Sequence, residues 1–245
     1  MNDTLKTIDL RRSTRVYESK EISATDKKVI LTAALNAPTA GNMVLYSMID
    51  VTDQEKKNQL SVLCDNQPFI AKAPMVVLFV TDALKWYAVY NQLNGTDLKP
   101  SIADFYLAMA DAHIAAQNAV IAAESIGIGS CYIGDIVENY EAIKAMFNLP
   151  KYVNPVCLLV FGYKKEGHLP QRPKRFNLED VVFENEFSNK FMEVFRNKFN
   201  HLTVAEQDEM VDKLVNGTFK RKQNADFFKE MNRSLTLMVD EYLKD

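Results

Sequence analysis

The chain has 245 residues, of which 47% are apolar and 25% charged, so it can close a sizeable hydrophobic core and is not disordered over most of its length. A net charge of −3 excludes the strongly basic surface of a nucleic-acid-binding domain. Three cysteines without paired spacing exclude a disulfide scaffold and a zinc knuckle and favour a reducing compartment. The N-terminal residues lack the apolar segment of a signal peptide, and no stretch is apolar enough for a lipid span. We expect a cytoplasmic protein with no metal site and with neither a nucleic-acid nor a membrane partner.

The first elements expected are one helix and two strands. Residues 25–36 follow Ser23, a typical helix-capping residue, and stop before Pro38, which predicts a helix ended by the proline. Residues 44–51 are rich in β-branched and bulky apolar side chains, and residues 75–80 form a continuous apolar run of strand length. Both segments predict strands buried in a sheet.

A long apolar helix is predicted over residues 101–126. Its polar side chains are confined to one stripe, seven residues apart, at Asp104, Asp111, Asn118 and Ser125. Because too little of its surface suits water, we expect this helix inside the protein or between subunits. Residues 130–133 and 156–161 predict two further strands, with a helix over residues 138–147 between them.

The composition changes toward the C-terminus. Residues 188–245 are densely charged, balanced in sign, and repeat apolar side chains at helical spacing, with a capping box at Thr203 and Glu206. This pattern predicts two or three amphipathic helices packed on the main body, and residues 181–183 are a short strand candidate. We divide the chain into a domain over residues 1–187 and a helical extension over residues 188–245.

Three guanidinium groups and two hydroxyl groups fall in one run near the N-terminus: Arg11, Arg12, Ser13, Thr14 and Arg15. Guanidinium forks bind phosphate oxygens in pairs and a hydroxyl adds a neutral donor, so this run suits a phosphate dianion. A solvated basic turn is the alternative. A second cationic run lies far along the chain, at Arg172, Lys174 and Arg175. The two runs can share one phosphate only if the fold brings them together.

Two loops can bring their backbone close to a ligand. In residues 38–42, Gly41 can take a positive φ and Asn42 offers an amide donor and acceptor, although a plain turn also explains both. Residues 127–135 are not a dinucleotide fingerprint, because their third glycine falls two residues late and they follow a helix. Gly127 fits a helix end, whereas Gly134, at the end of a strand, leaves room for a flat ligand.

These segments offer few acid or base groups. Neither a carboxylate pair nor a Ser/His/Asp spacing accompanies them, and we expect Cys131 to be a packing residue. We therefore expect no catalytic side chain and a cofactor that carries the chemistry.

In their order and spacing, the motifs over residues 7–185 resemble the FMN-dependent nitroreductase family. The similarity rests on residues 11–15, residues 38–42, Asn66 with Gln67, residues 127–134, and residues 161–163 with the second cationic run. The family implies an α+β fold with a central, mainly antiparallel sheet flanked by helices, in homodimers whose two FMN sites lie at the subunit interface. Residues 181–187 resemble its C-terminal extension, which reaches onto the other subunit.

The resemblance implies which residues hold FMN. Its phosphate, ribityl chain and pyrimidine edge would be held by Arg11, Arg12, Ser13 and Arg15. The later basic residues around the phosphate would be Arg172 and Lys174, with Arg175 in reserve. The partner subunit would contribute Pro38, Thr39, Gly41 and Asn42. The isoalloxazine ring would meet Gln67 at its edge and, on its face, Tyr132, Ile133 and Gly134. The sequence departs from the family pattern at Ala40 and in its long tail.

The implied activity is a ping-pong, two-electron reduction. NADPH or NADH would reduce the FMN, and a nitroaromatic, a quinone or a related acceptor would then take the electrons, while the protein supplies geometry and charge. An alternative from a different class is a flavin-binding sensor or carrier with little turnover, whose charged tail docks a partner. A helical interaction module without a cofactor leaves both cationic runs unexplained.

Overall fold

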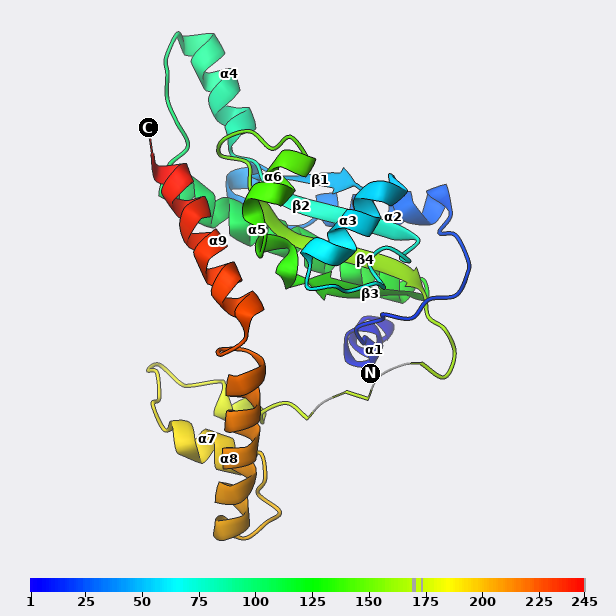
Figure 1. Ribbon diagram of the computed structural model, residues 1–245, viewed down its shortest axis with the longest axis vertical. Coiled ribbons are helices and arrows are strands. Elements are labelled where there is room, and N and C mark those ends of the chain that lie inside the picture. Colours follow the sequence, from blue (N-terminus) through cyan, green and yellow to red (C-terminus); the bar gives the residue numbers. More distant parts are fainter. Residues whose placement is uncertain (169–170, 173, 245) are drawn as a thin grey trace. The chain divides into compact units, whose positions relative to one another are not determined.

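The computed structural model describes residues 1–168, 171–172 and 174–244. It divides into two compact units (Figure 1). The main unit is Met1–Pro170 with Glu230–Asp245, and the second unit is Gln171–Lys229. The predicted division into a domain over residues 1–187 and a helical extension over residues 188–245 stays a prediction.

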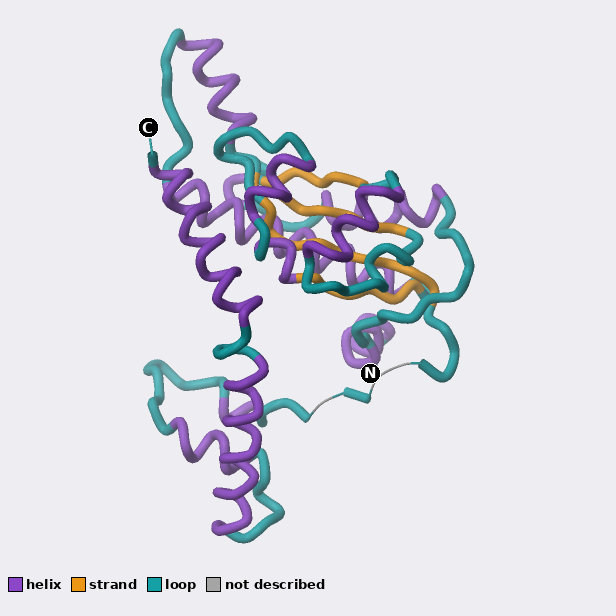
Figure 2. Tube along the Cα trace, viewed as in Figure 1, coloured by secondary structure: helices purple, strands orange, loops and turns teal. Residues whose placement is uncertain are grey.

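The described part of the main unit contains one four-stranded sheet (Figure 2). Its strands are β1 (Tyr46–Asp50), β2 (Met75–Thr81), β3 (Ile128–Ile133) and β4 (Pro155–Tyr163). They are ordered β1-β2-β4-β3, and each neighbouring pair is antiparallel. The predicted α+β fold and its four main strands are confirmed, with β3 at one edge of the sheet.

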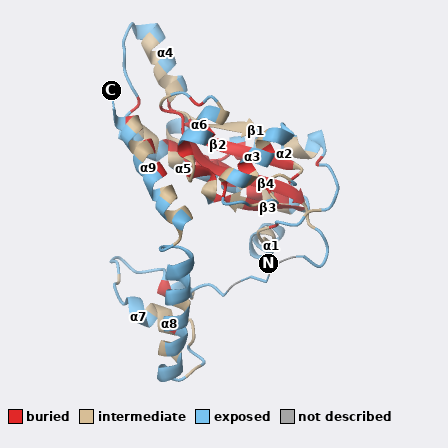
Figure 3. Ribbon diagram, viewed as in Figure 1, coloured by how far each residue is buried: buried red, intermediate tan, exposed pale blue. Residues whose placement is uncertain are grey.

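A hydrophobic core lies on each face of this sheet. Because successive strand residues point to opposite faces, Val77 and Phe79 pack with α2 (Ala24–Leu35) and α5 (Ile102–Ser125), whereas Leu78 and Val80 face the other way. The second face is covered by α3 (Gln54–Leu63), α6 (Tyr140–Met146) and the end of α9 (Asp226–Leu243). The sheet is accordingly the most deeply buried part of the main unit (Figure 3).

Short polar side chains start the helices as the sequence predicts. Ser23 accepts a hydrogen bond from the backbone N–H of Asp26 at the start of α2, and Ser101 forms a capping box with Asp104 at the start of α5. The remaining helices of the main unit are α1 (Asp3–Leu10) and α4 (Leu84–Asn94), which ends at Gly95 with a φ of 63°. Among the described residues, no helix has both the length and the apolar composition to cross a bilayer.

The long helix α5 packs on the sheet through small side chains. Most of its buried positions, between Ala108 and Ala123, are alanines, so the helix lies close to the strands. This confirms the predicted interior position for that face. The other side carries the α5 stripe, defined here as Leu107 and Ile114, which remain 40% and 41% exposed. Seven residues apart, these two side chains stand on the same face of the helix.

Among its described residues, the second unit contains the α-helices α7 (Phe191–Asn197) and α8 (Val204–Arg221) and the start of α9. With α9 they give three helices, where the tail predicts two or three, and the capping box at Thr203 is present. That these helices pack on the main body stays a prediction. The strand predicted over residues 181–183 is wrong. The N–H groups of Val181 and Val182 both donate to the carbonyl of Leu178, so the backbone turns where a strand would extend.

Gly129 and Gly162 are required where the N-terminal segment crosses the sheet. A Cβ atom at Gly129 would lie 2.7 Å from Thr14 Cβ and 2.9 Å from Lys164 Cγ. At Gly162 it would lie 2.8 Å from Tyr17 Cγ. Both glycines therefore let residues 14–17 pack directly on β3 and β4.

Alanine at Gly129 is expected to lower the free energy of unfolding by about 1 to 3 kcal/mol, because the added methyl overpacks a closed contact. Urea unfolding measures the change. Gly217→Ala is the control: its Cβ meets nothing within 4 Å inside α8, and it should stabilise the helix by about 0.5 to 1 kcal/mol. Equal stability of Gly129→Ala and the native chain would show that the crossing is loose.

Candidate functional site

The N-terminal arginine run is bound to the edge strand of the sheet. Ser13 and Ser130 form a parallel bridge, and the N–H of Thr14 donates to the carbonyl of Ser130 at 2.9 Å. Thr14 is buried, whereas Arg11 and Ser13 are half-buried and Arg15 is exposed. The run is therefore an ordered segment of the sheet edge, which argues against a freely solvated turn.

The three arginines of the run face different groups. Arg12 Nη1 donates to the carbonyl oxygens of Asp9 at 2.7 Å and Arg11 at 3.0 Å, so its guanidinium closes the end of α1. The charges of Arg11 and Arg15 both act on the Cys131 thiol of β3. Both charges therefore lie near Cys131, and the charge of Arg11 also acts on the neighbouring Tyr132.

Two side chains at the end of β3 are kept neutral. Burial raises the pKa of the Cys131 thiol, while the charge of Arg15 and a hydrogen bond from Ser13 oppose that rise. Burial and the nearby Cys157 raise the pKa of Tyr132, and the charge of Arg11 acts the other way. Cys131 is 2% exposed, as expected of a packing residue.

Gly134 follows β3 and lies open beside this cluster. It is exposed, and a Cβ atom placed on it would meet nothing within 4 Å. The preceding Ile133 is only 1% exposed, so its side chain belongs to the core and only its main chain can touch a ligand. The main chain at Gly134 therefore has the room that a flat ligand needs.

Gln67 is oriented toward the same end of β3. Its Nε2 donates to Asp135 Oδ2 at 2.7 Å and to the Cys64 carbonyl at 2.8 Å. The residue follows α3 through two left-handed residues, Asp65 and Asn66, with φ of 58° and 52°. With its amide hydrogens bonded inside the chain, Gln67 can offer a ligand its carbonyl oxygen.

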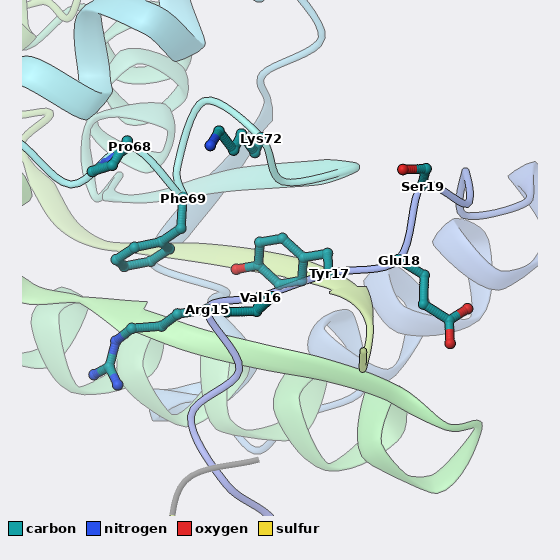
Figure 4. A pocket seen from close by; sticks show the side chains of 8 residues that line it. All are labelled: Arg15, Val16, Tyr17, Glu18, Ser19, Pro68, Phe69 and Lys72. Atoms are coloured by element: carbon teal, nitrogen blue, oxygen red, sulfur yellow. The ribbon is translucent and has the colours of Figure 1, made fainter. Parts of the chain in front are cut away.

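A cavity of about 590 Å³ opens beside Arg15 (Figure 4). The guanidinium carbon of Arg15 is 5.8 Å from the centroid of the Phe69 ring, within the range of a cation–π contact. Lys72 and the ring of Tyr17 also line the cavity. Phe69 thus restrains Arg15, and Lys72 adds a second cation to this region.

The loop of residues 38–42 is tightly shaped but exposes its tip. Gly41 and Asn42 have φ of 55° and 58° and are exposed, as is Pro38. The hydroxyl of Thr39 donates to Asp111 and accepts from the N–H of Val44, so this hydroxyl is bonded within the chain. The tip of the loop is what remains to meet a ligand.

The second cationic run belongs to the second unit. Arg172, Lys174 and Arg175 are exposed, and Lys174 Nζ donates to the Lys198 carbonyl at 2.8 Å. Pro173, between them, lies outside the described residues. That the two runs share one phosphate stays a prediction.

Sequence reasoning missed three residues that shape this region. Asp135 orients Gln67, Phe69 restrains Arg15, and Asp111 holds the loop of residues 38–42. The sequence offered one signal for Asp111, a carboxylate in the middle of an apolar helix. Nothing in the sequence singles out Phe69 or Asp135.

Known proteins resemble this chain in both sequence and structure. The model of the nitroreductase family matches residues 8–163. The chain belongs to the nitroreductase family. A CR(VI) reductase of Pseudomonas sp. (strain G-1) is 32% identical over 90% of this chain and 90% of its own length. An FMN reductase (NADPH) of Bacillus subtilis (strain 168) is 29% identical over 100% of this chain and 98% of its own. The structure of NfrA2 of B. megaterium superposes with a TM-score of 0.81 at 25% identity, covering 97% of this chain and 98% of that one.

One carboxylate near the site of this nitroreductase-family chain is expected to give it a pH-dependent stability. Burial, and then the charges of Asp65, Asp135 and Glu230, raise the pKa of Glu138 from 4.5 to about 7. Because the folded state binds this proton more tightly than the unfolded chain does, stability is lost as the pH rises from 4.5 to about 7. Glu138→Gln should therefore raise the free energy of unfolding at pH 8, by about 1 kcal/mol after allowance for solvent screening.

Urea unfolding at pH 5 and pH 8 checks this expectation. The difference in stability between the two pH values should shrink in Glu138→Gln and stay unchanged in Glu179→Gln, a control at an exposed carboxylate of the second unit. An unchanged difference in Glu138→Gln would contradict the assignment.

Proposed function

We propose that this chain is an FMN-dependent NAD(P)H oxidoreductase. The observation that carries the proposal is the N-terminal arginine run, bridged to the edge strand β3, which itself leads into the open main chain of Gly134. The names of the relatives, an FMN reductase (NADPH) and a reductase of CR(VI), support the same chemistry.

The residues of the main unit fit the parts of FMN. Arg11 and Arg15, with Ser13, supply forked and single donors for a phosphate and for the pyrimidine edge. Gln67 supplies an oriented amide, and Gly134 with the main chain of Ile133 supplies a flat, open surface. Tyr132 precedes this surface in β3 and stays neutral because burial raises its pKa.

FMN, when bound, supplies the two-electron chemistry between NADPH or NADH and a small acceptor such as a nitroaromatic or a quinone. The chain itself positions the cofactor and balances its charge. The cations Arg11 and Arg15 favour the binding of an anion and stabilise negative charge near it. Cys131 and Tyr132 are unsuited to act as general acids, since burial raises the pKa of each.

A second copy of the chain completes the site in this proposal. The exposed tip at Gly41 and Asn42, with Pro38 and Thr39, reaches the FMN of the other subunit. The exposed α5 stripe is consistent with a dimer, because a second copy packed on it would bury these two apolar side chains. Residues 181–187 extend onto that partner, and Arg172, Lys174 and Arg175 add to the phosphate site. Three free thiols and an NAD(P)H donor favour the cytoplasm.

Purified protein tests the proposal directly. We expect it to carry FMN or to quench the fluorescence of added FMN at one flavin per subunit. Colourless protein that leaves FMN fluorescence unchanged would refute the proposal. The sensor or carrier alternative predicts the same binding and differs in the rate at which NADPH or NADH reduces the bound flavin.

A further inference from the structure

Asp111 is a buried carboxylate at the centre of the apolar helix α5. It is 3% exposed, and within the described residues its hydrogen bonds come from neutral donors, all of them in residues 39–45. Oδ1 accepts from the N–H of Ala40 at 2.9 Å, and Oδ2 accepts from the N–H of Leu45 at 3.2 Å and from the hydroxyl of Thr39. One side chain therefore fixes both ends of the loop.

The loop held by Asp111 is strained. Val44, a β-branched residue, has a φ of 51°, a conformation that costs such a residue about 1 to 2 kcal/mol. Its N–H donates to the Thr39 hydroxyl at 2.8 Å, and that hydroxyl is in turn bound by Asp111. On the other flank, Trp86 Nε1 donates to the Met43 carbonyl at 2.7 Å. The loop is thus held in a single conformation whose tip, Gly41 and Asn42, is exposed.

Asp111 also lies beside the surface proposed to meet the second copy. Leu107 and Ile114 stand four residues before it and three after it, so Asp111 lies at the border between the buried face of α5 and the α5 stripe. The α5 stripe and the exposed loop tip therefore flank the same buried carboxylate. A second copy that packs on the α5 stripe therefore lies next to the exposed loop tip at Gly41 and Asn42.

From this juxtaposition we propose that Asp111 is a positioning residue for the FMN site of the partner subunit. It holds the loop of residues 39–45 in the conformation that presents Gly41 and Asn42 to a flavin bound by the other copy's arginines. The inference rests on the proposed function, in which that loop acts across the interface. If the loss of Asp111 leaves this loop in its binding conformation only about a tenth of the time, the FMN affinity falls about tenfold.

The first measurement needs no cofactor. In flavin-free protein, Asp111→Asn keeps the volume of the side chain but places an amide N–H₂ where the N–H of Ala40 or Leu45 donates. We expect hydrogen exchange of these two amides to accelerate while exchange in β2 and β4 stays slow. Unchanged exchange at Ala40 and Leu45 would overturn the proposal. Ser125→Ala, at an exposed position of the same helix, is the matched control.

The second measurement asks in which subunit Asp111 acts. Two chains, one with Arg11→Ala and Arg15→Ala and one with Asp111→Asn, are co-expressed with different affinity tags and the mixed dimer is isolated. One of its two sites then has intact arginines from one chain and an intact loop from the other. The proposal predicts one site per mixed dimer with native FMN affinity, although the Asp111→Asn homodimer binds FMN about tenfold more weakly.

The outcomes separate this inference from the proposed function. Native affinity in the Asp111→Asn homodimer, or a mixed dimer with two weakened sites, would overturn the role of Asp111 across the interface. Native FMN affinity in the homodimer without the two arginines would instead refute the proposed site. A mixed dimer with one native site also shows that Asp111→Asn chains fold and assemble.

Discussion

Replacing Arg11 and Arg15 together by alanine is expected to weaken FMN binding about a hundredfold or more. Hydrogen bonds to charged groups contribute about 1.5 to 3 kcal/mol each, so the loss of one such bond at each residue accounts for at least two factors of ten. Fluorescence titration of flavin-free protein measures the dissociation constant. Because Arg15 is exposed and Arg11 only half-buried, the fold should survive the change.

Two exposed cations serve as the control for lost charge. Lys6→Ala with Lys28→Ala removes the same net charge from α1 and α2, where both side chains are exposed. This pair should leave the FMN affinity near that of the native chain. If the two double variants weakened binding equally, the arginines would act only through the overall charge.

Glutamate at both Leu107 and Ile114 is expected to dissociate the dimer and to lower FMN affinity at the same time. Each side chain is about 40% exposed in the single chain, and an unpaired charge buried in an interface costs several kcal/mol. Light scattering after gel filtration gives the mass of the assembly, and FMN titration gives the affinity. Val62→Glu, at an apolar side chain of α3 that is 61% exposed, is the control and should leave the mass unchanged.

A dimer that survives both charges would place the subunit interface elsewhere. A monomer that keeps its full FMN affinity would contradict a site shared between two copies. The combined result therefore tests the proposed partner and the proposed site separately.

The sequence predicts most of the sheet because its strands are buried on both faces. Residues 75–80 and 156–161 are continuous apolar runs, and they become the central strands β2 and β4. Helix α5 is equally predictable, from Ser101 at its start to Gly127 just beyond its end, where φ is 80°. In contrast, α1, α3 and α4 were not predicted, because few or none of their residues are buried and the apolar pattern is weak.

Elements of the candidate site that depend on long-range contacts were not predictable. Asp111 belongs to the polar stripe predicted for residues 101–126, and the loop that buries it, residues 39–45, lies far away in the sequence. Gly129 and Gly162 belong to motifs that carry the family resemblance, and the structure shows that they make room for Thr14 and Tyr17. Such assignments require knowing which segment crosses which strand, and one sequence does not contain that information.

The measurement that tests the central claim most directly is anaerobic stopped-flow mixing of the FMN-loaded protein with NADPH or NADH. If the chain is an FMN-dependent NAD(P)H oxidoreductase, at least one of the two donors should rapidly bleach the absorbance of oxidised flavin. That absorbance should return when a quinone or nitroaromatic acceptor is added. Bound flavin that stays oxidised with both donors would contradict the claim and favour a flavin sensor or carrier.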